Sequence, residues 1–508
     1  MRAESMPGIP EHLLIAGVLL ILLLTFGLVE LMERGRHRRR GYWRYDLLRF
    51  APLRRVMESR LLQPVLQLPV VALFLLIILA GLMGEQRPDR NIATVLTWVV
   101  WWALLVFVLV VAGKVWCTVC PWNAISDWVR RRSLWKRVRD EELFTLNLKW
   151  PDRLKNIYLA TGFFVLLTWL ELGLGVTGSP RITAYLGLLI LVMALVPAVL
   201  FEGKPFCRYA CLVGRISGLY AMFSPVELRS RSKRLCRRCR SRDCHRGNER
   251  GYPCPTFESL HTMDSNTYCI LCTECVKSCR HGNVALNLRT PAADLMELRK
   301  PRRDEALLSL VMLSMTSFHG ITMTPQWFSW LVELQERLSV GYYAAFTLMM
   351  LVVLTLFPAV FYVVCVLSRR ASGSEVPVSR IFINYAYPLL PIALFYHLAH
   401  NTMHFFREGQ KLLPVLSDPF GWGWNLFGTA GAAPEPLLSF TAIWYLQVFF
   451  IVLGHVFSIL VASKVARITF AEQSSAFRSL LPQLAVLVGY SAFSLWLIAQ
   501  PMVMRTSM

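Results

Sequence analysis

The stretch that decides the fold class is residues 61–84, which read LLQPVLQLPVVALFLLIILAGLMG. It contains no charged residue. An α-helix rises about 1.5 Å per residue, so about 20 apolar residues cross the ~30 Å hydrocarbon core of a bilayer. This stretch therefore predicts a membrane-spanning helix.

Runs of the same kind recur along the 508-residue chain. We predict spans at 13–31, 61–84, 93–113, 156–178, 183–202, 306–323, 341–367, 382–405, 442–466 and 483–500. The composition agrees, because 55% of the residues are hydrophobic and 17% are charged, against about 25% charged in soluble proteins. A soluble enzyme, a secreted disulfide scaffold and a disordered chain are excluded. The predicted fold class is an all-α polytopic membrane protein with about ten transmembrane helices.

The positive charge of the chain, +22 overall, is distributed unevenly between its loops. Of the 54 Lys and Arg residues, 46 lie in the alternate loops 32–60, 114–155, 203–305, 368–381 and 464–482, and 8 lie elsewhere. Such alternation marks the cytoplasmic side of a membrane protein. We expect a bacterial-type inner (plasma) membrane location with both termini outward, in contact with membrane lipid and without a nucleic-acid partner.

The predicted organisation has three parts. Residues 1–202 form an N-terminal membrane domain of about five helices, and its first run is an uncleaved anchor because a basic flank, and no small-residue cleavage site, follows it. Residues 203–305 form a small cytoplasmic insert with too little apolar sequence for a core of its own, as is typical of metal-dependent domains. Residues 306–508 form a C-terminal membrane domain of about five helices.

The insert contains eight closely spaced cysteines. The run Cys269-x2-Cys272-x2-Cys275-x3-Cys279 has the spacing of bacterial ferredoxins. A second, looser set precedes it at Cys236, Cys239, Cys244 and Cys254. Zinc also binds four-cysteine sites, but this run is far more typical of an iron–sulfur cube. We therefore predict two [4Fe-4S] clusters.

The insert resembles a two-cluster ferredoxin, and the resemblance implies which cysteines share a cluster. One cluster is expected on Cys254, Cys269, Cys272 and Cys275. The other is expected on Cys236, Cys239, Cys244 and Cys279. In this crossed arrangement each motif gives one ligand to the cluster of the other.

Two further cysteine pairs follow the third and fifth apolar runs. They are Cys117 with Cys120, and Cys207 with Cys211. Four thiols at one membrane depth are a possible third iron–sulfur or iron site, or paired dithiols with a redox or structural role. Cys365 stands alone and is expected to be a small buried hydrophobe.

The first pair carries a family resemblance. The segment Cys117-Thr-Val-Cys120-Pro-Trp-Asn-Ala-Ile-Ser-Asp-Trp-Val-Arg-Arg-Arg132, followed by a second pair and ferredoxin cysteines, is similar to the NapH/MauN family of membrane iron–sulfur proteins, which is related to the membrane half of NosR. The resemblance covers residues 60–290. It implies electron transfer from membrane quinol through clusters to respiratory partners. This sequence departs from the family pattern in three ways. Its first pair is CxxCP where the family has CxxxCP, and Leu212 follows the second pair where the family has Pro. An additional C-terminal membrane domain follows the cluster cysteines.

Five histidines lie in apolar runs of that C-terminal domain: His319, His397, His400, His404 and His455. Ionisable groups are costly in hydrocarbon, so each is a functional candidate. Three of them follow i, i+3, i+7 spacing on one helix face, and we expect all five to approach one another in the outward half of the bilayer. The alternatives are axial ligands of haem b, a quinone pocket, a copper site that includes Met315 and Met323, and ordinary helix packing.

These features predict a membrane electron-transfer protein. It passes electrons between the quinone pool, with haem b as a possible carrier, and the [4Fe-4S] clusters, and then to a protein redox partner. Whether it is itself a quinol dehydrogenase or an electron-transfer subunit stays open. Basic residues around the cluster cysteines, such as Arg237, Arg238, Arg240 and Arg242, either raise the cluster potentials or are ordinary cytoplasmic loop charges. The alternative functions are a cluster-dependent copper reductase for metal maturation and a redox-sensing regulator.

Overall fold

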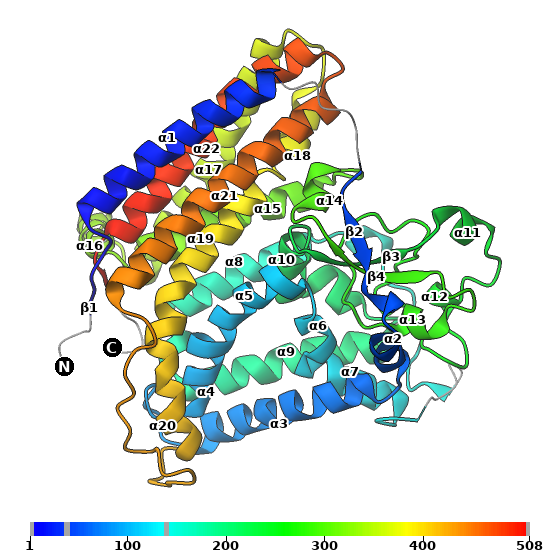
Figure 1. Cartoon of the computed structure of the whole chain (residues 1–508). Coiled ribbons are helices and arrows are strands. Elements are labelled where there is room, and N and C mark those ends of the chain that lie inside the picture. Colours follow the sequence, from blue (N-terminus) through cyan, green and yellow to red (C-terminus); the bar gives the residue numbers. More distant parts are fainter. Residues whose placement is uncertain (1–4, 35–40, 137–141, 504–508) are drawn as a thin grey trace.

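Long apolar helices make up most of the computed structural model, which describes residues 5–34, 41–136 and 142–503 (Figure 1). Eight of the described helices are long and apolar enough to cross a bilayer: Glu11–Leu31, Leu62–Met83, Ile92–Ala112, Pro180–Leu200, Tyr342–Ser372, Val378–Ser417, Phe440–Thr469 and Gln473–Ala499. Each overlaps a predicted run. The chain is therefore a mostly helical protein with several helices suited to a membrane.

The other two predicted runs form helices of a different kind. Helix α8 (Tyr158–Gly173) is apolar but has only 16 residues, about 24 Å. Helices α15 (Arg303–Ile321) and α16 (Pro325–Leu338) meet at an angle of 94°, so they form a broken span or a re-entrant loop. The described residues therefore contain eight candidate spans, or nine with the bent pair, and the count of ten stays a prediction.

The helices form two groups that meet along α5 and α8 (Figure 1). One group contains α3 (Leu62–Met83), α7 (Pro121–Arg131), α9 (Pro180–Leu200) and α5 (Trp102–Ala112), which continues α4 (Ile92–Thr94) and a π-helical stretch, Val95–Trp101. The other contains α15, α17 (Tyr342–Ser372), α18 (Val378–Tyr385), α19 (Leu389–Met403), α21 (Phe440–Thr469) and α22 (Gln473–Ala499).

The first helix, α1 (Glu11–Arg34), packs against α21 and α22 rather than against its neighbours in sequence. A Cβ at Gly17 would lie 2.9 Å from the side chain of Leu495, so the two helices approach closely there. Strand β1 (Ser5–Met6) also pairs antiparallel with β5 (Met502–Val503). The predicted N-terminal membrane domain of residues 1–202 includes this helix, because hydropathy alone does not indicate which helices are neighbours.

The cysteine-rich region is built on a three-stranded sheet in the order β2-β4-β3. Strands β3 (Val226–Ser230) and β4 (Val284–Arg289) come from the predicted insert, but β2 (Arg44–Asp46) comes from the loop after the first helix. Short helices α2 (Ala51–Glu58), α11 (Lys233–Arg238), α12 (Asp243–Arg246), α13 (Glu274–Ser278) and α14 (Ala293–Met296) complete it. Its small core is shared between apolar side chains and the cysteines themselves.

Two segments in which a long helix ends and a short helix soon follows connect this region to the long helices, and we call them the helical breaks. Helix α5 stops at Gly113, whose φ of +63° favours glycine, and α6 (Trp116–Val119) and α7 follow in quick succession. Helix α9 is followed in the same way by a π-helical turn, Phe206–Ala210, and by α10 (Leu212–Tyr220). Both membrane-edge cysteine pairs lie in these breaks.

Candidate iron–sulfur and quinone sites

The eight cysteines of the insert line two cavities. One cavity is lined by Cys236, Cys239, Cys244 and Cys279, together with polar residues of the same loops. The second is lined by Cys254, Cys269, Cys272 and Cys275, and Cys244 lines this cavity as well. The grouping is the crossed one that the ferredoxin resemblance implies, since the last cysteine of each motif lies with the other motif.

Local backbone geometry turns these thiols inward. Leu271 and Thr273, on either side of Cys272, both have positive φ angles, of 57° and 62°. This left-handed backbone, rare outside glycine, wraps the loop around the second cavity. At the first cavity, the Asn283 side chain donates to Sγ of Cys236 at 3.1 Å and its backbone N–H donates to Sγ of Cys279 at 3.4 Å. Such donors stabilise thiolate ligands of clusters.

The two cavities are rich in possible thiolate ligands. Each is lined by at least four cysteines. Within the described residues, no three His, Cys, Asp or Glu side chains converge as ligands of a single metal ion. Cysteine thiolates are the usual ligands of iron–sulfur clusters.

The four membrane-edge cysteines come together from the two helical breaks. Burial raises the pKa of the Cys120 thiol well above its ordinary value, and the nearby Cys117, Cys211 and Cys207 raise it further. Burial likewise raises the pKa of Cys211 to about 12, with Cys207 and Cys117 adding to it. The two breaks also match in geometry, because Cys120 and Cys211 are the N-cap residues of α7 and α10. Helix N-termini favour thiolates.

Three of the five histidines share one pocket. Its lining consists of Trp98, Val99, Trp102, Glu171, Thr177, His319, Met323, His400, Asn401, His404 and Glu408. The rings of His319 and His400 meet edge to face with centroids 5.2 Å apart, and those of His400 and His404 are 5.0 Å apart. The pocket thus lies where α15 and α19 meet the π-helical start of α5.

Two carboxylates accompany these histidines. Nδ1 of His404 lies 2.7 Å from Oε2 of Glu408, one helical turn further along. Nδ1 of His319 lies 3.9 Å from Oε1 of Glu171, which comes from α8. Neither carboxylate was predicted, although Glu171 is an ionisable residue within an apolar run and Glu408 is the i+4 neighbour of His404.

The remaining two histidines do not line the pocket. His397 is held between the hydroxyls of Tyr220 and Thr316, at 2.6 and 3.0 Å. His455 contacts the hydroxyls of Thr25 and Ser491, at 2.7 and 2.9 Å. The expected meeting of all five is therefore not observed, because these two are engaged by hydroxyl groups at other helix contacts.

A row of tryptophans connects the histidine pocket to the cysteines. The ring of Trp102, in the pocket wall, lies 5.9 Å from that of Trp101. The Trp101 ring lies 5.3 Å from that of Trp116, the residue before Cys117. It also lies 6.2 Å from Trp122, two residues after Cys120. The π-helical turn at Val95–Trp101 lies at the start of this row.

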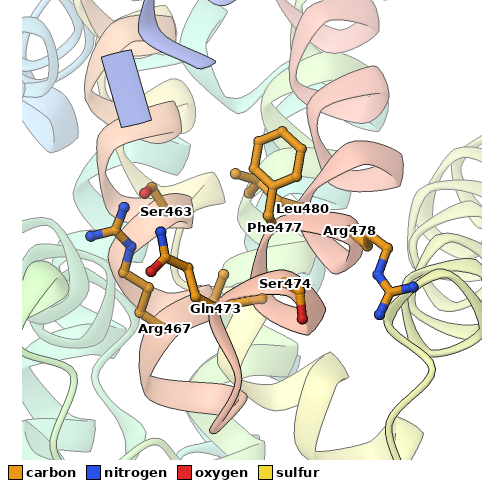
Figure 2. Close-up of a pocket in the computed structure, with 9 residues that line it drawn as sticks. Ser463, Arg467, Gln473, Ser474, Phe477, Arg478 and Leu480 are labelled. Atoms are coloured by element: carbon orange, nitrogen blue, oxygen red, sulfur yellow. The ribbon is translucent and has the colours of Figure 1, made fainter. Parts of the chain in front are cut away.

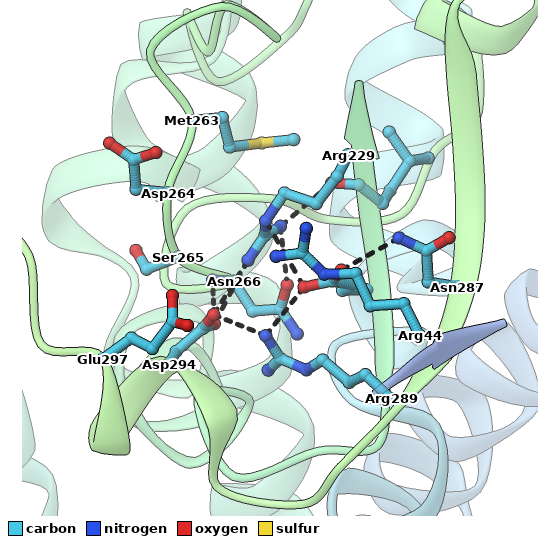
Figure 3. A network of polar contacts seen from close by, with 12 residues as sticks. Arg44, Arg229, Met263, Asp264, Ser265, Asn266, Asn287, Arg289, Asp294 and Glu297 are labelled. Carbon is cyan, nitrogen blue, oxygen red and sulfur yellow. Dashed lines mark hydrogen bonds and ion pairs between the residues drawn. The ribbon is translucent and has the colours of Figure 1, made fainter. Parts of the chain in front are cut away.

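A buried ionic network joins the sheet to α14 and to the loop at Asn266 (Figure 3). Arg289 binds Glu227 at 2.9 Å and also binds Asp294. Arg229 binds Asp294 at 3.0 Å, and Asn266 donates to the backbone carbonyls of Ala221 and Val226. These arginine and carboxylate side chains are almost completely buried. The network thereby positions the loop that leads into Cys269.

A further cavity of about 290 Å³ lies at the turn between α21 and α22. In Figure 2 Arg467 and Gln473 lie near Ser463, and Arg478 points away from them. Its described lining contains neither cysteine nor histidine. We assign it no redox role.

Comparison with known proteins supports iron–sulfur chemistry. A family described as 4Fe-4S binding domain matches residues 94–139 and 183–232. These two ranges contain the two membrane-edge cysteine pairs and do not include the eight cysteines of the ferredoxin-like insert. The chain is also 28% identical, over 203 residues, to an uncharacterized protein of Methanocaldococcus jannaschii, covering 40% of this chain and 74% of that protein. No solved structure matches the chain.

Proposed function

We propose that the protein passes electrons between a membrane quinol and two [4Fe-4S] clusters, and on to a protein partner. One observation carries the proposal. The pocket of three histidines and two carboxylates is joined through Trp102, Trp101 and Trp116 to the four-cysteine site. The family match supports the iron–sulfur part, and the long apolar helices support the membrane part.

The cysteines would hold the electron carriers. Two [4Fe-4S] clusters fit the two cavities of the insert, and a third iron–sulfur centre fits the four membrane-edge thiols. Bound clusters supply one-electron carriers. The chain's own contribution is to orient the thiolates, to donate hydrogen bonds to sulfur from residues such as Asn283, and to exclude water with the small apolar core. The similarity to NapH/MauN proteins agrees with this assignment.

The histidine pocket would bind the quinol head group. Oxidation of a quinol to a quinone releases two electrons and two protons. The imidazoles of His319 and His404 are close to carboxylates, Glu171 and Glu408, which stabilise an imidazolium after it accepts a proton. The faces of Trp98 and Trp102 form an apolar wall suited to an aromatic ring.

Haem b fits this arrangement less well. Axial histidines approach haem iron from opposite faces, with the macrocycle between them. His319 and His400 are instead in direct edge-to-face contact, and so are His400 and His404. We therefore derive no step through haem and propose the quinone alternative.

The orientation of the charges supports a cytoplasmic partner. The cavity lined by Cys236 lies among exposed arginines, including Arg237 and Arg240. An acidic redox protein is the class of partner that such a surface attracts. The bacterial-type inner-membrane location, the cytoplasmic insert and the outward termini belong to the same proposal.

The test is reduction of the anaerobically purified protein by a quinol analogue such as duroquinol, followed by visible absorption and EPR. We expect cluster bleaching in the wild type, and strong loss of it in His400→Gln. His455→Gln is the matched control, because that histidine is also buried in a helix but lies outside the pocket. If dithionite reduces the clusters and the quinol analogue does not, the proposal is wrong.

The same preparation discriminates the alternative functions. Met323 lines the pocket beside the histidines, and thioether with imidazole is a donor set for Cu(I). A copper reductase would retain stoichiometric copper that is lost in His400→Gln. A redox sensor would show clusters that respond to oxidant without turnover of quinol.

A further inference from the structure

Two cations are buried beside the four membrane-edge cysteines. Arg215 on α10 is 0% exposed, and none of its three guanidinium nitrogens hydrogen-bonds to a described residue. Lys114, directly after Gly113, is 1% exposed, and its amine contacts the carbonyl of Thr267 at 3.3 Å. Neither forms an ion pair with a carboxylate of the described chain within 4.0 Å.

Other buried cations of the chain are paired. Lys204 lies 2.6 Å from Asp127, Lys277 lies 2.9 Å from Glu274, and Arg289 binds two carboxylates. Burying a charge without a partner costs several kcal/mol, so such pairing is the rule. Arg215 and Lys114 depart from this rule, and each adjoins one cysteine pair: the N–H of Arg215 donates to the carbonyl of Cys211 at 3.0 Å, and the N–H of Cys117 donates to the carbonyl of Lys114 at 3.1 Å.

The groups that face these two cations are thiols and a phenol. Arg215 lies over the ring of Tyr268 at 4.7 Å and within electrostatic reach of Cys117 and Cys211. Lys114 is within reach of the same two cysteines and of Cys269. The nearby carboxylate of Glu305 accepts hydrogen bonds from the hydroxyls of Tyr268 and Tyr387, so it is engaged elsewhere.

We infer that Arg215 and Lys114 are the counter-charges of an anionic [4Fe-4S] centre held by Cys117, Cys120, Cys207 and Cys211. The inference rests on the third centre proposed above and distinguishes between its alternatives. Four neutral thiols or two disulfides bring no charge to balance two buried cations. A [4Fe-4S] cube with four thiolates carries a net charge of about −2 when oxidised and about −3 when reduced.

The position of the cations also gives them a function. Lys114 connects the two cysteine regions, because its carbonyl accepts from the N–H of Cys117 at 3.1 Å and its amine contacts the carbonyl of Thr267, two residues before Cys269, a predicted ligand of the next cluster. A fixed positive charge there stabilises an added electron on either side, and burial keeps solvent from screening it. The cations would therefore raise the potential of the third centre and favour its reduction.

The test compares Arg215→Gln, which removes the charge, with Arg215→Lys, which keeps it, in the full-length protein. In the wild type we expect about twelve iron atoms per chain, from three four-iron clusters. In Arg215→Gln, a mediated redox titration followed by EPR should show the reduced-to-oxidised ratio of one centre lowered about tenfold at fixed potential, a midpoint ~59 mV lower. Arg215→Lys should restore it.

Each other outcome has a defined meaning. Loss of about four iron atoms in Arg215→Gln, with recovery in Arg215→Lys, supports the inference, whereas equal loss in both variants overturns it. A wild type with about eight iron atoms and disulfides or free thiols at these four cysteines also overturns it. Because the titration uses chemical mediators, it is independent of quinol. Failure of quinol reduction alone therefore refutes the proposed function and leaves this inference standing.

Discussion

The ring centroids of Trp101 and Trp116 lie 5.3 Å apart, although fifteen positions of sequence separate the two residues. The end of helix α5 at Gly113 permits this contact, because the chain turns there and brings the segment that carries Cys117 back toward the start of α5. The contact therefore belongs to the row of tryptophan rings between the histidine pocket and the cysteines.

Replacing Trp101 by leucine should slow cluster reduction by quinol about tenfold, equivalent to ~1.4 kcal/mol of barrier. Stopped-flow bleaching of the clusters measures this rate. Trp169→Leu is the control, since Trp169 packs against Tyr343 on α17, away from the route. Equal rates in both variants would mean that the tryptophan row is only packing.

The Glu408 carboxylate should act as the proton partner of His404. Glu408→Gln keeps the shape of the side chain and removes its charge, so the quinol-driven rate should fall about 100-fold. Dithionite reduction, which needs no proton acceptor in the pocket, should stay unchanged. Glu435→Gln is the control for the loss of one carboxylate, because Glu435 is exposed in the loop that precedes α21 and does not line the pocket. A normal quinol-driven rate in Glu408→Gln contradicts the role.

The crossed cluster assignment predicts which cysteine variants share a phenotype. Cys279→Ser should delete the same EPR signal as Cys236→Ser, because both thiols line one cavity. Cys254→Ser should instead match Cys275→Ser. If Cys279→Ser matches Cys275→Ser, its neighbour in sequence, the clusters are built from consecutive motifs and the assignment is wrong.

Much of the fold was predictable because its signals are local. Apolar runs of sufficient length specify helices, and eight of the ten predicted runs are candidate spans in the structure. The cysteine spacing similarly indicated ferredoxin-type ligands, and these eight cysteines line two cavities. Both patterns depend on residues near one another in sequence.

The rest depends on packing between distant segments. Strand β2 joins the insert from the other side of the first helix, and α1 packs on α22, neither of which hydropathy encodes. Helical spacing placed His397 with His400 and His404, yet Tyr220 from α10 engages His397. Trp101 and Arg215 gave no signal, because their importance arises only when their surroundings are assembled.

The pairing of β1 with β5 predicts that both ends of the chain lie on one side of the membrane. The distribution of Lys and Arg predicts that this side faces outward. Alkaline phosphatase fused after the C-terminus should therefore be active, and a green fluorescent protein at the same place should be dark. Insertion of either reporter at Gly373, in the turn between α17 and α18, should give the opposite result. The same reporter response at both positions would refute the orientation.

The buried network of Figure 3 should contribute strongly to the stability of the cluster region. Asp294→Asn removes a carboxylate that binds both Arg229 and Arg289, so it leaves two buried cations with one shared partner, Glu227. Breaking a buried ion pair from one side costs about 3–5 kcal/mol. The melting temperature, followed by bleaching of cluster absorption, should fall by many degrees.

Glu297→Gln is the matched control for this variant. Glu297 lies just beyond α14 and binds the exposed Arg299 at 2.8 Å, an ion pair of the surface type worth about 1 kcal/mol or less. Its melting temperature should stay close to that of the wild type. Asp294 touches no cysteine in the network, so its loss should lower thermal stability without changing the EPR line shape of the clusters that remain. If the two variants melt at the same temperature, the network contributes no more than a surface pair, and the sheet is held to the helices by apolar packing alone.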